Sequence, residues 1–213
     1  MELSKQVIKF IKTFRGLIRD YKFDALYEEA YNIFISNTYF IGELTDAFLA
    51  SGIDPVEYFH NEIPFNYLHG SKIKTYSMPD RIEWIGQEAF IHCKDLREIK
   101  LSKNLRYIGD GAFTNCMMLD VDLTQCPNLR TIGLNAFDSC MFTSVVIPES
   151  VTTIEASAFR DCSELESVTI LGKDTVIEKY AFFAVPLTCV FKCKKGSKAE
   201  EYAKPKGFKV EYI

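Results

Sequence analysis

A short phrase that contains Ala-Phe occurs five times in the second part of this chain. Its first copy is IGQEAFIHC at residues 85–93, and each later copy places its phenylalanine 22 to 24 residues further on. A fixed period of this length predicts a solenoid, because one unit cannot bury its own hydrophobic side and needs neighbours stacked on it. Stacking would align the repeated phenylalanines as a ladder: Phe90, Phe113, Phe137, Phe159 and Phe182.

Four copies of the phrase carry a cysteine three residues after the phenylalanine, and the fifth has Val185 there. These cysteines are Cys93, Cys116, Cys140 and Cys162. One cysteine per coil at an equivalent position indicates a buried structural side chain, since buried cysteine behaves as a small hydrophobe. Zinc sites are usually built from closely spaced ligands such as C-x-x-C, which does not occur here. Cys189 and Cys193 could join a ligand set only with one of three histidines, so we expect no metal and no cofactor.

Each unit also contains a short extended run after the cysteine position. Apolar side chains alternate at the ends of the runs 96–101, 119–123, 143–147 and 165–170. Such alternation is typical of a strand with one face buried. We expect one strand per repeat, stacked in parallel, and a solvent-facing surface that a partner could bind. The outward residues of that surface are Glu98, Lys100, Asp120, Asp122, Ser144, Val146, Ser167 and Thr169.

The repeated pattern resembles the BspA-type class of leucine-rich repeat proteins, most closely in IPESVTTIEASAFRDCSELESVTI at 147–170. The tail KGSKAEEYAKPKGFKVEYI resembles that family's terminal segment, a short helix and strand that cap the last coil. The resemblance implies a leucine-rich-repeat solenoid with a parallel β-sheet over residues 73–213, about five repeats, and a C-terminal cap from about residue 194. The third repeat departs from the pattern through the insertion TQCPN.

Residues 1–72 precede the repeats, and their apolar spacing of three to four residues predicts helices. The whole chain is therefore expected to be α+β, a helical N-terminal unit followed by the solenoid. Residues 21–70 hold one lysine against eight acids. This acidic, aromatic leader could meet a basic protein surface, or its acids could simply be the solvated exterior of a helical core. The candidate acidic face consists of Asp24, Glu28, Glu29, Glu43 and Asp46.

The N-terminus MELSKQVIKFIKTFRGLIRD interrupts its apolar residues with a charge every three or four positions. It therefore lacks the apolar core of a secretory signal, and no run approaches the roughly 18 apolar residues of a membrane span. An odd number of cysteines argues for reduced thiols. We expect a cytoplasmic protein. The layout of a helical leader and a few repeats is also similar to proteins encoded by bacteriophages, which would place it in the host-cell cytoplasm.

The sequence contains no motif for catalysis. It has no phosphate-binding loop, and no glycine-rich turn follows a strand in the dinucleotide-binding pattern. A reactive thiol needs a nearby base, whereas His92 beside Cys93 would point to the opposite side of the chain. We expect neither an enzyme nor a small-molecule substrate.

Without a catalytic or metal site, we expect the function to depend on the protein's surfaces. Solenoids present extended faces to other proteins. We expect a protein-binding module, in its concrete form an inhibitor or adaptor that docks on a host or defence-system protein. One alternative is a cell-surface adhesin of the BspA type. Another is nucleic-acid binding through the lysine-rich C-terminal end, although a solvated cap is the simpler interpretation. The lysines concerned are Lys192, Lys194, Lys195, Lys198, Lys204, Lys206 and Lys209.

Overall fold

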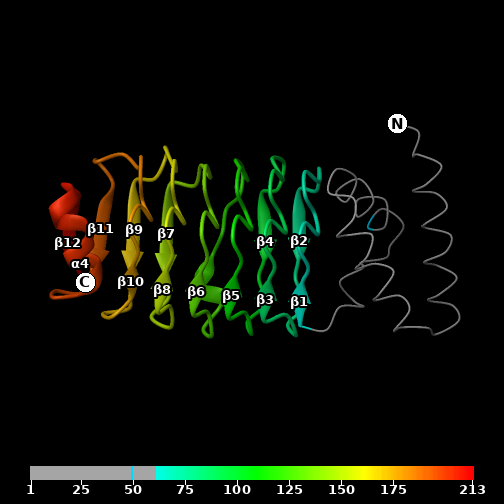
Figure 1. Cartoon of the computed structure of the whole chain (residues 1–213), viewed down its shortest axis with the longest axis horizontal. Coiled ribbons are helices and arrows are strands. Elements are labelled where there is room, and N and C mark those ends of the chain that lie inside the picture. Colours follow the sequence, from blue (N-terminus) through cyan, green and yellow to red (C-terminus); the bar gives the residue numbers. More distant parts are fainter. Residues whose placement is uncertain (1–48, 50–60) are drawn as a thin grey trace, which may run out of the picture.

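A computed structural model of the chain describes residue 49 and residues 61–213. Residues 61–213 form a solenoid of parallel strands in about seven turns (Figure 1). This architecture confirms the solenoid predicted from the period of the phenylalanines and the leucine-rich-repeat fold that the family resemblance implied. The helices expected before residue 61, and with them the five residues of the candidate acidic face, lie outside the described residues.

Each coil contributes a short strand at the isoleucine of the repeated phrase. These strands pair in parallel as one six-stranded sheet, in which each isoleucine of the first five strands is buried and the residue before it faces outward. In order along the sheet they are β1 (Glu62–Ile63), β3 (Trp84–Ile85), β5 (Tyr107–Ile108), β6 (Thr131–Ile132), β8 (Thr153–Ile154) and β10 (Val176–Ile177). The expectation of one strand per repeat was therefore wrong, because a two-residue strand is too short to show alternation in a sequence.

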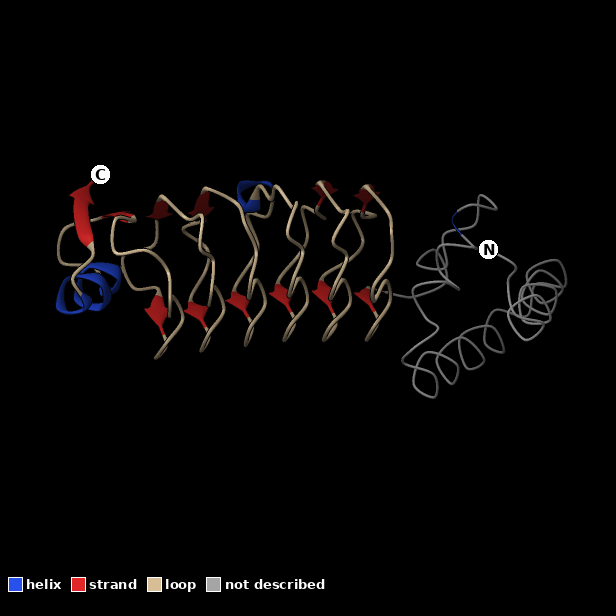
Figure 2. Ribbon diagram, turned by 90° about the horizontal axis from the view of Figure 1, so that it is seen from above, coloured by secondary structure: helices blue, strands red, loops and turns tan. Residues whose placement is uncertain are grey.

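A second row of strands comes from the extended runs that follow the cysteines. Figure 2 shows the short strands in one row and the longer strands, with the 3-10 helix η2, in another row. The longer strands form a two-stranded sheet, β2-β4, and a four-stranded sheet, β12-β11-β9-β7. They are β2 (Thr75–Ser77), β4 (Glu98–Lys100), β7 (Ser144–Ile147), β9 (Ser167–Ile170), β11 (Val190–Cys193) and β12 (Lys209–Tyr212).

The gap between these two sheets falls where the second repeat ends and the third begins, and a strand over 119–123 was expected there. Only an isolated parallel bridge joins Glu98 to Asp120, and the chain then enters η2 (Leu123–Gln125). The Asp122 side chain accepts a hydrogen bond from the Thr124 backbone N–H at 2.9 Å and so caps η2. The expected strand is wrong because the inserted TQCPN gives this coil a local hydrogen-bonded turn that competes with the ladder.

The solenoid begins before residue 73, where the sequence placed the first repeat. β1 pairs with β3, with Glu62 opposite Trp84. The Leu68 N–H donates to the Ala89 carbonyl, as the Phe90 N–H donates to the next coil's alanine carbonyl. Leucine instead of phenylalanine, with Ser71 at the cysteine position, hid this first coil from a search for the repeated phrase.

Two residues in each coil adopt the left-handed backbone region. One precedes the repeated alanine and the other precedes the cysteine, and both turn the chain between the two rows of strands. Asparagine, aspartate and glycine reach this region at the lowest cost, which explains their frequency in the variable positions of the phrase. Examples are Gly111 (φ 62°), Asn115 (φ 60°), Asn135 (φ 54°), Ser139 (φ 58°) and Asp161 (φ 54°).

The core between the two rows is a stack of aromatic rings. Phe90, Phe113, Phe137, Phe159 and Phe182 are all buried, and successive ring centroids lie 5.0 to 5.3 Å apart with the planes within 12° of parallel. This spacing follows from the roughly 4.8 Å that parallel strands impose on successive coils. The phenylalanine positions are thus held by backbone pairing on both sides of the stack.

The C-terminal end of the stack is covered by the helix α4 (Lys198–Ala203), the 3-10 helix η3 (Lys204–Lys206) and β12. Ser197 caps α4, because its hydroxyl accepts from the Glu200 backbone N–H. The buried Tyr202 packs edge-on against Phe182 and accepts a hydrogen bond from the Phe182 N–H at 3.1 Å. The cap therefore shields the apolar side chains of the last coil from water and supplies a hydrogen-bond partner for its backbone.

Candidate functional site

The outward residues of the longer strands lie on one surface, here called the sheet face. Val121, Val145 and Val168, which alternate with them, are buried. Five of the eight predicted sheet-face residues are exposed: Glu98, Lys100, Asp120, Asp122 and Ser144. The other three, Val146, Ser167 and Thr169, are half-buried, and Val146 and Thr169 are register partners across β7 and β9.

The sheet face also extends further than the sequence predicted. Thr75 and Ser77 of β2 lie opposite Glu98 and Lys100. At the other end Lys192 of β11 lies opposite Thr169. The sequence missed these positions because the first coil and the cap do not repeat the phrase from which the face was derived.

A groove opens where the sheet is interrupted at the third repeat. Its first part, about 310 Å³, is lined by Glu98, Ile99, Lys100, Asp120, Asp122 and Gln125. Its second part, about 650 Å³, shares Glu98 and Asp120 and continues toward the loops after the cysteines. The lining there is Arg97, Met117, Met118, Leu119, Met141, Phe142, Thr143 and Ser144. Because η2 stands where a strand would lie, no strand continues the sheet between β4 and β7, and the surface is hollowed there.

Three methionines form the apolar edge of the groove. Met117, Met118 and Met141 are 40%, 51% and 44% exposed, whereas most other apolar side chains among residues 61–213 are buried. Methionine is flexible and polarizable, and it adapts to the shape of a bound surface. The signal was present in the sequence as CMMLD and CMFTS, two apolar pairs directly after a cysteine, whereas Cys93 and Cys162 are followed by polar pairs.

The charged residues of the groove differ in how far they are already engaged. The carboxylate of Asp122 accepts from the hydroxyl and the backbone N–H of Thr124, and these hydrogen bonds lower its pKa. Glu98 and Asp120 have no ion-pair partner within the described part of the chain. These two side chains, from neighbouring coils, are therefore the acids most available to a partner.

The cysteine ladder lies in the interior and its thiols are held by the backbone. Each Sγ donates to a carbonyl of the preceding coil: Cys93 to Leu68 at 2.9 Å, Cys116 to Phe90 at 3.1 Å, Cys140 to Phe113 at 3.2 Å and Cys162 to Phe137 at 3.2 Å. Burial raises the pKa of Cys116 and of Cys162 to about 12. A protonated, hydrogen-bonded thiol is neither a nucleophile nor a ready metal ligand at neutral pH.

The described residues also bear on metal binding and on the membrane. Residues 61–213 contain no cluster of three or more histidine, cysteine, aspartate or glutamate side chains that could hold a metal ion. The rings of His69 and His92, on neighbouring coils, lie with centroids 5.7 Å apart and planes at 60°. Within the same part of the chain, no helix has the length and apolar character needed to cross a bilayer.

The lysine-rich end is largely neutralised by nearby acids. Lys194 pairs with Glu149 at 2.7 Å, and Lys204 pairs with Glu200 at 2.6 Å. The Lys204 ammonium lowers the pKa of Glu200 to about 2, together with the Gly196 N–H. Lys198 and Lys209 also have acidic partners. Lysines engaged in this way form a solvated cap more readily than a phosphate-binding patch.

Parallel coils, a buried aromatic ladder and a cap over the last coil define a leucine-rich-repeat solenoid. The chain belongs to the BspA-type leucine-rich repeat family, whose model matches six copies over residues 61–185 and 120–203. A search of the curated proteins finds no match.

The chain is also similar to solved structures. A leucine-rich repeat protein of T. pallidum, TpLRR, is 27% identical, with a TM-score of 0.50 over 70% of this chain and 78% of that one. The pneumococcal vaccine antigen PcpA is 14% identical, with a TM-score of 0.48 over 72% of this chain and 44% of that one.

Proposed function

We propose that this chain is a protein-binding module whose partner docks on the sheet face at the groove of the third repeat. The leucine-rich-repeat fold suggests such a module. The groove is the observation that supports this position for the interface. It combines an adaptable apolar edge, Met117, Met118 and Met141, with the unengaged carboxylates of Glu98 and Asp120. Apolar anchors beside a polar rim are the usual composition of a protein interface.

We further propose that the module works as an inhibitor or adaptor in the cytoplasm, on a host or defence-system protein if a phage encodes it. The chain's seven cysteines are all buried thiols rather than disulfides. Proteins that fold in oxidising compartments commonly use such a supply of cysteines for disulfides. The thiols therefore support a reducing compartment, against the alternative of a cell-surface adhesin.

Site-specific crosslinking tests the position of the interface. A photo-crosslinking residue replaces Met118 in the full chain, and the matched control carries the same residue at the exposed Lys173, in the loop between β9 and β10. Both are irradiated in nuclease-treated lysate of the native host. We expect one stoichiometric protein adduct at position 118, lost when Met117 and Met141 are changed to serine, and none at position 173.

Three results would contradict the proposal. Adducts at position 173 alone would move the interface away from the groove. Adducts that form only when the nuclease is omitted would favour the lysine-rich cap as a nucleic-acid site. Adducts only with extracellular material, from a chain found outside the cell, would favour the adhesin.

A further inference from the structure

The six-stranded sheet carries an exposed aromatic pair on its outward side. Trp84 of β3 and Tyr107 of β5 are register partners, with ring centroids 5.7 Å apart and planes at 44°. Trp84, the only tryptophan of the chain, is 44% exposed. The same column continues with Thr131 and Thr153, so the fold does not need aromatic rings at these positions. Exposed tryptophan and tyrosine are the residue types that most often anchor a partner.

Carboxylates surround this pair and continue along the solenoid. Glu62 is the register partner of Trp84 on the other side, and the Tyr107 hydroxyl donates to Asp110 Oδ1 at 3.3 Å. Asp110 and Glu155 both accept from the Leu134 N–H at 3.1 Å, so their carboxylates meet over the coil between them.

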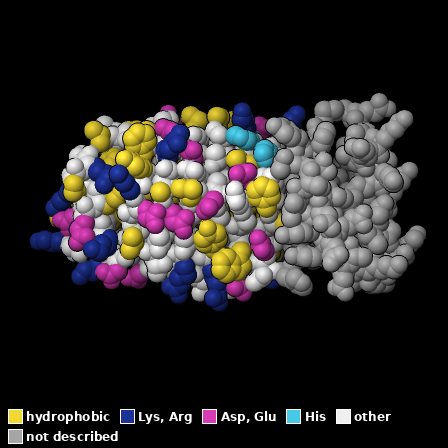
Figure 3. All heavy atoms as spheres, viewed as in Figure 1, with side chains coloured by type: hydrophobic (Ala, Val, Ile, Leu, Met, Phe, Trp, Pro, Cys, Tyr) yellow, Lys and Arg dark blue, Asp and Glu magenta, His cyan; other side chains and the backbone are white. Residues whose placement is uncertain are grey.

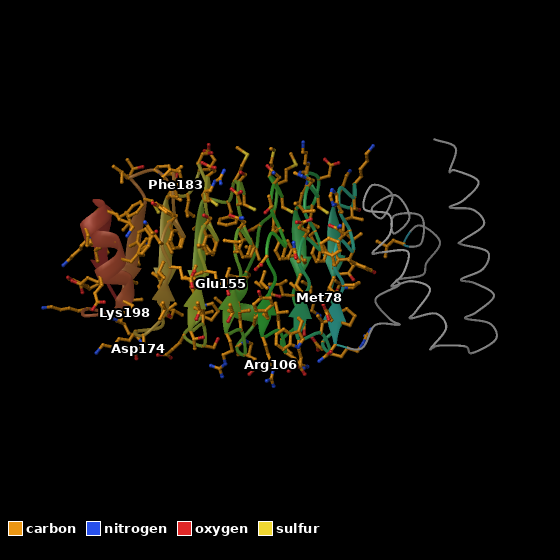
Figure 4. All side chains as sticks on the ribbon, viewed as in Figure 1. Met78, Arg106, Glu155, Asp174, Phe183 and Lys198 are labelled. Carbon is orange, nitrogen blue, oxygen red and sulfur yellow. The ribbon has the colours of Figure 1, made fainter. Side chains whose placement is uncertain are left out.

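Glu178 extends this series by one more coil, because it accepts from the Ala156 N–H at 3.1 Å. Asp110, Glu155 and Glu178 are here called the carboxylate row. Figure 3 shows acidic side chains in a row along the viewed face with hydrophobic side chains beside it, and Figure 4 labels Glu155.

The carboxylate row has no counter-charge of its own. Among residues 61–213, neither Glu62 nor any member of the row is in an ion pair. Burial, together with the charges of Asp110 and Glu178, raises the pKa of Glu155. Arg106, at the edge of the same coils, is already paired with Glu83 at 3.2 Å. A cation brought by a partner would relieve this repulsion.

We propose that the Trp84–Tyr107 pair and the carboxylate row bind an extended, arginine- or lysine-rich segment of a partner protein. A cation over an aromatic ring is attracted by the ring's quadrupole, and carboxylates beside the ring strengthen the preference for positive charge. The same carboxylates repel phosphates and so exclude nucleic acid. From Trp84 to Glu178 the surface spans four coil steps, roughly 19 Å, which is about six residues of extended chain.

This surface belongs to a different sheet from the groove, so the two proposals stand or fall separately. The test uses the full chain and fluorescein-labelled octa-arginine and octa-lysine peptides, with a Gly-Ser octapeptide as the neutral control. Fluorescence anisotropy measures affinity, and Trp84 emission reports directly on the proposed contact. We expect the basic peptides to bind and to change Trp84 emission, with affinity that falls as salt is added.

Matched variants separate a built site from general attraction to an acidic protein. Trp84→Thr with Tyr107→Thr introduces the residue that already stands at the same register in the next coils. It should weaken binding at least tenfold and leave the melting temperature nearly unchanged. Asp110→Asn with Glu155→Gln should weaken binding at least fivefold. Glu164→Gln with Glu166→Gln removes the same charge beside β9 and should change binding less than twofold.

The inference is overturned by any of three results. One is equal loss of binding in the two charge-removing double variants, which would mean unspecific electrostatics. Another is binding that survives the loss of both rings. The last is a neutral hexasaccharide that changes Trp84 emission while octa-arginine does not, because the rings would then be a sugar-stacking platform.

Discussion

Removing one ring from the middle of the phenylalanine stack tests the mechanism that holds the solenoid together. Phe137 is fully buried and contacts three other rings: Phe113 and Phe159, each stacked at 5.3 Å, and Phe142, edge-on at 6.0 Å. Phenylalanine to alanine in a core costs about 3–5 kcal/mol, depending on how well the site can collapse. The neighbouring rings are held by the backbone pairing of their own coils, so the cavity stays open.

The expected loss for Phe137→Ala is therefore at the upper end, about 5 kcal/mol, because about 0.5–1.5 kcal/mol per aromatic pair is lost as well. That is comparable with the whole stability of many domains. Phe137→Leu is the matched control. Since Leu68 occupies the equivalent position in the first coil, leucine should cost only about 1–2 kcal/mol.

Urea unfolding followed by circular dichroism gives the free energy of unfolding of each variant. A lower urea slope in the alanine variant would show that the halves of the solenoid no longer unfold together. The reasoning is refuted if alanine costs less than about 2 kcal/mol, or no more than leucine, since a stack held from both sides could not absorb the loss so easily.

Three further perturbations have outcomes set by the same structure. Burial raises the pKa of the Cys116 thiol to about 12 in the fold, from 9 in the unfolded chain. The protonated thiol therefore stabilises the fold fully below pH 9, and this stabilisation is lost as the pH rises from 9 to 12. Alkaline unfolding of Cys116→Ala should show a slope shallower by about 1.4 kcal/mol per pH unit between pH 9 and 12, and an unchanged slope would contradict its burial as a thiol. Gly109→Ala would put Cβ 2.5 Å from the Ile85 carbonyl oxygen, so thermal melting should show a loss of about 1–3 kcal/mol, and a neutral result would refute this close approach. Tyr202→Phe leaves the buried Phe182 N–H without its partner and should lower the free energy of unfolding, measured in urea, by about 1–3 kcal/mol. No change would mean that water replaces the hydroxyl, and it would contradict the prediction.

The sequence was most informative where one position repeats. Phe113 and Phe137 identified the period, and with it the stack, the buried cysteines and the alternation of the longer strands. Leu68 and Ser71 broke the phrase, so the first coil was missed although its backbone pairs like the others. Asp122 stood in a run that alternates like a strand, but its own carboxylate favours a turn, which local pattern alone cannot weigh against a ladder.

The candidate surfaces were also predicted only in part from the sequence. The outward positions of the sheet face, such as Glu98 and Asp120, followed from alternation along a strand. The groove between them and the pairing of Trp84 with Tyr107 did not, because both depend on which coils stack next to each other and in what register.

The sequence by itself determined the repeating core, since burial of one apolar ladder per coil is a periodic, local requirement. Only the tertiary structure decided where that regularity is interrupted and which side chains of distant coils share a surface. Those outcomes depend on backbone pairing between residues more than 20 positions apart, which no single repeat contains.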